Sequence, residues 1–90
     1  MQILDYVLKM TCGACPEQYD VFDSDGKQVG YLRLRHGGFR ADYPDCGGDT
    51  VYRCSFDDGW KGIFEDDEER EQYLTEAVKA IHNHERRQNA

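Results

Sequence analysis

Residues 28–43, which read QVGYLRLRHGGFRADY, decide the fold that the sequence predicts. Apolar and polar side chains alternate along both halves of this stretch, and successive side chains of a strand point to opposite faces. The central His36-Gly37-Gly38 supplies the positive-φ positions of a tight turn, at either His36-Gly37 or Gly37-Gly38. The stretch therefore predicts a β-hairpin with one apolar face. That face consists of Leu32, Leu34, Phe39, Ala41 and Tyr43.

The opposite face of the predicted hairpin carries three arginines and a tyrosine. Asp20 and Asp42 fall on the same face and can neutralise part of that charge across the strands. A solvated face and a platform for single-stranded nucleic acid are both compatible with this pattern. Because arginine and tyrosine are favoured at protein interfaces, we interpret it as a candidate protein-contact surface. The residues of this surface are Tyr31, Arg33, Arg35 and Arg40.

A further strand is predicted on each side of the hairpin. Residues 17–23 precede it and are joined to it by an Asp25-Gly26 turn, a strong hairpin signal. The cross-strand pairs expected from a two-residue turn are Tyr19 with Leu32, Asp20 with Tyr31 and Phe22 with Val29. Residues 50–56 follow the hairpin. Their alternation places Tyr52, Cys54 and Phe56 on one side of the strand and Val51, Arg53 and Ser55 on the other.

The C-terminal part of the chain predicts a helix over residues 66–84. Asp66 or Asp67 caps its start, where acidic residues complement the helix dipole. Its apolar stripe with 3–4 spacing consists of Tyr73, Leu74, Ala77, Val78 and Ile81. One apolar stripe fits one face of a sheet. The predicted fold class is therefore α+β, an antiparallel β-meander of about four strands with one C-terminal helix packed on one face.

The whole chain of 90 residues is predicted to be a single domain, since this length supports one modest core. Residues 1–16 are expected to be a lead-in that ends in a Cys-x-x-Cys knuckle, and residues 17–56 to form the sheet. Within the lead-in, residues 1–10 are compatible with a first strand or an irregular segment, and the spacing of Ile3, Tyr6, Val7 and Met10 is also compatible with a short helical stripe. The apolar residues Ile3 and Leu4 are broken at once by Asp5, and no basic segment precedes them. We therefore expect no secretory signal, no membrane span and a cytoplasmic protein.

The net charge of −7 is concentrated in one part of the chain, since residues 42–76 hold twelve acids and three bases. This balance disfavours direct binding to nucleic acid or to membranes, and it favours a partner protein with a basic surface. We call the densest group of acids the acidic segment and predict that it contacts such a partner; the alternative is a helix start whose acids only keep the surface solvated. Its residues are Asp57, Asp58, Glu65, Asp66, Asp67, Glu68, Glu69 and Glu71.

The cysteines raise the possibility of a structural zinc ion, which would be the only cofactor. Cys12 and Cys15 have the spacing of a zinc-binding pair. Cys46 and Cys54 would have to supply the other two ligands, although they are further apart than such a pair normally is. The alternative is four reduced thiols with no metal. A thioredoxin-like redox role is disfavoured, because a proline and a strand follow the motif instead of a helix.

No arrangement typical of catalysis is recognisable in the sequence. There is no nucleophile-elbow motif and no glycine-rich phosphate loop. We therefore predict that the protein is not an enzyme.

The order of motifs in this chain resembles that of small uncharacterised proteins of bacteria and their phages. The motifs are CxxCPEQYDVFD, an Asp-Gly turn, VGYLRLRHGGFR, GG-x-x-VY and an acidic start to the last helix. This resemblance implies a non-enzymatic protein-binding module, of the kind by which a phage or mobile element inhibits a host nucleic-acid-binding system, such as anti-CRISPR or antirestriction proteins. The alternative is a zinc-stabilised structural or regulatory module with cysteine ligands.

Overall fold

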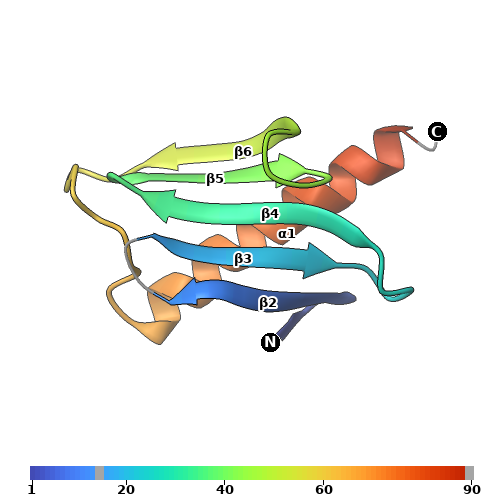
Figure 1. Ribbon diagram of the computed structural model, residues 1–90, viewed down its shortest axis with the longest axis horizontal. Helices are drawn as coiled ribbons and strands as arrows, with labels where there is room; N and C mark the ends of the chain where they lie inside the picture. Colours follow the sequence, from blue (N-terminus) through green and yellow to red (C-terminus); the bar gives the residue numbers. More distant parts are fainter. Residues whose placement is uncertain (14–15, 89–90) are drawn as a thin grey trace.

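The computed structural model describes residues 1–13 and 16–88, which form one antiparallel sheet and one helix (Figure 1). The strands are β1 (Gln2–Ile3), β2 (Tyr6–Gly13), β3 (Glu17–Phe22), β4 (Gln28–Arg35), β5 (Gly38–Tyr43) and β6 (Asp49–Ser55), and the helix is α1 (Asp67–Gln88). Each strand pairs with its neighbour in sequence, so the sheet order is β1 to β6. The α+β meander with a C-terminal helix is therefore confirmed, with six strands where about four were expected.

The two additional strands lie in the segment that was expected to be a lead-in. Tyr6 and Leu8 alternate into the core from β2, and a turn at Leu4, with φ of 55°, joins β2 to the short β1. The apolar residues of this segment also fit a weak helical spacing, and this hid the alternation of buried and exposed residues that is typical of a strand. The predicted knuckle is only partly visible: Cys12 belongs to β2, while Cys15 lies outside the described residues.

The hairpin at the centre of the sheet has the predicted faces. His36 and Gly37 form the turn with φ angles of 51° and 75°, the signs that a two-residue hairpin turn requires. Leu34 pairs with Phe39, and both are buried. Gly37 is needed for a second reason, because a Cβ there would lie 2.5 Å from the Asp58 carbonyl oxygen.

Two β-bulges change predictions that were based on strict alternation. Tyr19 does pair with Leu32, but Phe22 pairs with Gln28 and not with Val29. The ladder shifts there, and Val29 is fully buried in the core. A second shift, between β5 and β6, lets Val51 pack against the core, although alternation had assigned it to the opposite face. Both errors arise because a bulge inserts one extra residue into one strand.

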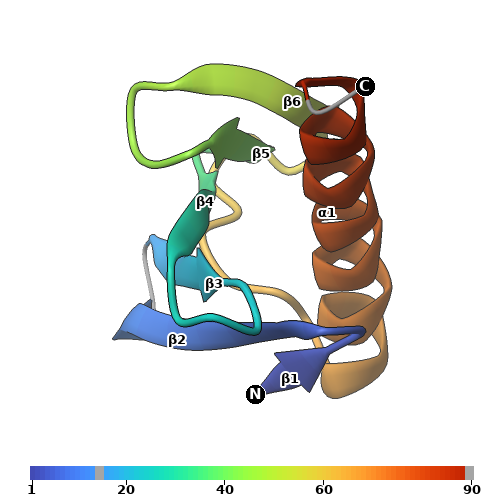
Figure 2. The same ribbon diagram turned by 90° about the vertical axis from the view of Figure 1, so that its right-hand side faces the viewer.

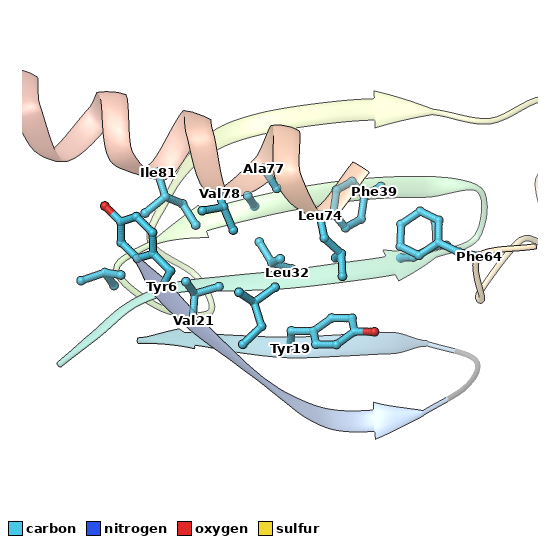
Figure 3. Close-up of a cluster of buried hydrophobic side chains, with 14 residues drawn as sticks. Tyr6, Tyr19, Val21, Leu32, Phe39, Phe64, Leu74, Ala77, Val78 and Ile81 are labelled. Carbon is cyan, nitrogen blue, oxygen red and sulfur yellow. The ribbon is translucent and has the colours of Figure 1, made fainter. Parts of the chain in front are cut away.

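The core lies between the sheet and α1. Figure 2 shows the sheet curling around the helix, with β6 near one end and β1 and β2 near the other. The predicted helix stripe is confirmed: Leu74, Ala77, Val78 and Ile81 are fully buried. They meet side chains from the central strands, among them Val21 and Leu32 (Figure 3). No helix within the described ranges is long and apolar enough to cross a membrane.

A buried ion pair joins the start of β3 to the start of α1. Glu17 is only 1% exposed, and its carboxylate receives Nε and Nη2 of Arg70 at 2.9 and 3.3 Å. The Tyr19 hydroxyl donates to it at 2.6 Å and the Phe64 amide at 3.2 Å. A buried charge is tolerated when it is paired and hydrogen-bonded in this way. Burial, and then the hydrogen bond to Glu17, raise the pKa of Tyr19.

Candidate functional site

The sheet face opposite α1, which we call the outer face, carries a row of arginines across three strands. Arg33 of β4 pairs directly with Arg40 of β5, and Arg40 pairs directly with Arg53 of β6. Neighbouring strands are about 4.8 Å apart, so the three Cα atoms lie within roughly 10 Å. Arg35 adds a fourth cation on the same face, two residues further along β4. We call these four residues the arginine face. The outer face of the sheet is turned towards the viewer in Figure 1, with α1 behind it.

A shallow hollow of about 200 Å³ lies within the arginine face. Arg33, Arg35, Arg40 and Arg53 all line it. Gly38, which is paired with Arg35 on one side and with Ser55 on the other, also lines it and contributes no side chain. The bottom of the hollow is therefore backbone at Gly38, its sides are guanidinium groups, and the Ser55 hydroxyl group lies next to it.

The charge of this face is poorly compensated. Like charges directly opposite each other in a sheet are destabilising, by a few tenths of a kcal/mol up to about 1 kcal/mol per pair. Among the described residues, the one ion pair of these arginines joins Arg40 Nε to Asp42 Oδ2 at 3.4 Å. That Nε atom is buried and makes no hydrogen bond with any described residue. Arg33, Arg35 and Arg53 make no ion pair with any described residue, and their guanidinium groups are the donors that the arginine face offers to an anion.

Asp42 and Tyr31 are buried beneath the arginine face and are not part of its exposed surface. Asp42 is buried, and its carboxylate also accepts hydrogen bonds from the Thr50 hydroxyl at 2.9 Å and the Gly47 amide at 3.2 Å. Tyr31, predicted as a contact residue, is 8% exposed and can offer little area to a partner. Burial raises the pKa of Tyr31, and the nearby charges of Arg33 and Arg40 oppose this rise.

Four of the eight acids in the acidic segment form hydrogen bonds or ion pairs within the protein itself. The Asp66 carboxylate accepts the Glu69 amide at 2.8 Å, as a helix cap does, and Asp67 pairs with Arg70 at 2.6 Å. Lys61 Nζ lies 2.8 Å from Glu69, and its hydrogen bond lowers the pKa of that carboxyl group. Asp58 accepts the Trp60 amide at 2.9 Å. The acids of the segment with no such bond among the described residues are Asp57, Glu65, Glu68 and Glu71.

An exposed tryptophan lies beside the turn that joins β4 to β5. Trp60 is 85% exposed, on a loop whose Lys61 carbonyl accepts the Gly37 amide at 2.9 Å. Its ring meets His36 edge-on, with centroids 6.4 Å apart. The loop is therefore attached to the turn between β4 and β5, and it presents a large exposed aromatic side chain beside His36.

The predicted cysteine ligands are not gathered among the described residues. Cys12 lies on β2 and Cys54 on β6, with three strands between them. Cys54 is partly buried against the core, and burial raises the pKa of its thiol, which disfavours the thiolate that binds zinc. Cys46 is exposed in the loop after β5. No group of three or more candidate metal ligands occurs in residues 1–13 and 16–88. Zinc binding by the pair Cys12 and Cys15 stays a prediction.

Three residues of the site were missed in the sequence. Arg53 had been assigned to the side facing away from the core, but it was not joined to the hairpin arginines. Gly38 and Ser55 had no individual signal, since a glycine beside a turn and a serine in a strand are ordinary. The antiparallel order of β5 and β6 would have brought Arg53 opposite Arg40 if the register of this pair had been worked out.

The chain was compared with known proteins at three levels. No family model, no curated protein and no solved structure matches it.

Proposed function

We propose that this protein is a non-enzymatic protein-binding module whose arginine face contacts an acidic surface on its partner. The observation that carries the proposal is the direct register of Arg33, Arg40 and Arg53 across three strands. A sheet selected for stability alone would alternate charges or place threonine at such positions. Arginine is also among the residues that contribute most to binding at protein interfaces.

The position of Trp60 supports the same proposal. An exposed tryptophan buries a large apolar area when a partner covers it, and it carries one hydrogen-bond donor. Its loop is held by backbone hydrogen bonds from Phe56 to Gly37 at 2.7 Å and from Gly37 to Lys61 at 2.9 Å. A loop that is already ordered loses little conformational freedom on binding. We therefore include Trp60, together with the arginine face, in the candidate contact.

The acidic segment is a weaker candidate for the contact. Asp58, Asp66, Asp67 and Glu69 already serve the loop and the start of α1 through hydrogen bonds and ion pairs. A partner with a basic surface would compete with those bonds. The acids on the exposed side of α1 remain a suitable comparison in the experiment that follows.

Affinity capture from a lysate of the organism that encodes the chain tests the proposal. Three forms of the immobilised protein are compared: wild type, the double variant Arg33→Thr/Arg53→Thr, and the double variant Glu68→Gln/Glu71→Gln. We expect wild type and the glutamine variant to retain the same partner protein, and the threonine variant to lose it.

The threonine variant removes two positive charges and the glutamine variant two negative ones, so the comparison separates the arginine face from the acidic segment as the contact. Both are first checked for a native circular dichroism spectrum. Retention of the partner by the threonine variant, or its loss from the glutamine variant alone, would contradict the proposal and favour the acidic segment.

A further inference from the structure

We infer that the hollow of the arginine face binds a phosphoryl group, and that the acidic partner presents it as a phosphorylated side chain. This inference rests on the proposed function and names the chemistry that the face recognises. It starts from the four guanidinium groups that line the hollow and from the single buried carboxylate beside them.

The charge of the hollow matches a dianion better than a carboxylate. One arginine satisfies a carboxylate through two parallel hydrogen bonds, whereas four arginines surround this hollow. A phosphorylated side chain carries about −1.5 to −2 charges and three acceptor oxygens at neutral pH. Its binding would also relieve the repulsion between Arg33 and Arg40 and between Arg40 and Arg53, which face each other directly.

The shape of the hollow supports the same ligand. Gly38 leaves its floor open, so that an anion can approach the backbone between Arg35 and Ser55. Four guanidinium groups line this one concavity. Planar guanidinium groups bind phosphate oxygens through paired hydrogen bonds, so several of them suit an oxyanion with three free oxygens.

A nucleic-acid strand fits this face less well. Tracking a strand requires a groove with successive aromatic platforms. Here Tyr31 is buried, and the exposed Trp60 lies on the loop beside His36 and not within the hollow. The arginine row spans only three strands, and the chain as a whole carries a net charge of −7. A compact anion matches these dimensions better than a polyanion does.

In the test, a short peptide with one phosphoserine flanked by glycines is titrated into the isotope-labelled 90-residue chain. Binding is measured from the chemical shifts of the backbone amides by NMR. The same peptide with serine or with glutamate at that position, and an oligothymidylate strand, are titrated in parallel. We expect the phosphopeptide to shift the amides of Gly38 and Ser55 and to bind at least about tenfold more tightly than the glutamate peptide.

Two variants test the site itself. Arg53→Gln removes one of the four guanidinium groups that line the hollow. Gly38→Val places a side chain at the bottom of the hollow and keeps every charge. A Cβ at Gly38 would lie 3.6 Å from the Arg35 carbonyl oxygen, an ordinary contact, so we expect this variant to fold. Each should weaken phosphopeptide binding by at least about tenfold. Arg86→Gln, at the exposed end of α1, makes the same charge change away from the hollow and should leave the affinity unaltered.

Equal affinity for the phosphoserine and glutamate peptides would overturn the inference, as would wild-type affinity in both site variants. Tighter binding of oligothymidylate than of the phosphopeptide would overturn it in favour of nucleic acid. These failures are separable from failure of the proposed function. If capture of the partner still requires Arg33 and Arg53 while the phosphopeptide does not bind, the protein contact stands and only the phosphoryl chemistry is wrong.

Discussion

Replacing Glu17 with alanine is expected to lower the free energy of unfolding by about 3–5 kcal/mol, the usual effect of removing one partner from a buried ion pair. The carboxylate accepts from the Tyr19 hydroxyl, from the Phe64 amide and twice from Arg70. Without it, two buried donors lose their acceptor, and each orphaned group costs about 1–3 kcal/mol. Arg70 would keep Asp67 as its exposed partner, so the remaining cation is only partly compensated.

Urea unfolding of the variant measures this effect directly. Glu68→Ala, at an exposed position at the start of the same helix, is the matched control and should change the stability by less than about 0.5 kcal/mol. The double variant Glu17→Leu/Arg70→Leu should be more stable than Glu17→Ala, because it leaves no unpaired charge at the site. Unfolding of Glu17→Ala at the same urea concentration as Glu68→Ala would show that the buried pair does not hold the sheet and helix together.

Phe39→Ala is the second large effect, with an expected loss of about 3–5 kcal/mol. Phe39 is 1% exposed and meets three aromatic rings edge-on. Its centroid lies 5.2 Å from that of Phe64, 5.9 Å from that of Tyr52 and 6.4 Å from that of Tyr73. Removing the ring leaves a cavity that β5, β6, the loop before α1 and α1 itself all border. Figure 3 shows Phe39 and Phe64 at this end of the core.

Thermal unfolding, together with the near-ultraviolet circular dichroism of the aromatic cluster, checks this prediction. Phe39→Leu keeps most of the volume and should lose markedly less stability than the alanine variant. Trp60→Ala removes an even larger ring from an exposed position and should change the stability by less than about 0.5 kcal/mol. Similar melting temperatures for Phe39→Ala and Trp60→Ala would contradict the description of the core.

The hairpin of β4 and β5 could be predicted because its local signals agree with one another. Alternation assigned Leu32, Leu34 and Phe39 to the core, and the His36-Gly37 turn matched the required geometry. The helix stripe was equally clear, because its spacing of three and four residues continues over several turns. Fold class follows from such patterns, since one apolar stripe and one apolar sheet face have few ways to cover each other.

The details that alternation missed depend on tertiary structure. A bulge has no reliable local signature, so Val29 and Val51 were placed on the wrong face or opposite the wrong partner. Glu17 reads as a surface acid, although its parity with Tyr19 and Val21 assigns it to the core side. Only the opposing Arg70, distant in the sequence, makes its burial understandable. The full arginine row likewise needs the register of β6, which no single segment specifies.

The most direct test of the central claim is the free energy of unfolding of Arg33→Thr/Arg53→Thr at low ionic strength, with Arg35→Thr as control. Arg35 lies on the same face, but it pairs with Gly38 and not with another arginine. If the row serves binding, removing its two outer charges relieves the repulsion in both pairs, and the variant should be more stable than wild type, by up to about 1 kcal/mol for each pair. Added salt should shrink this gain through screening. A double variant that is less stable than both wild type and Arg35→Thr would show that the row supports the fold itself, and would contradict the account.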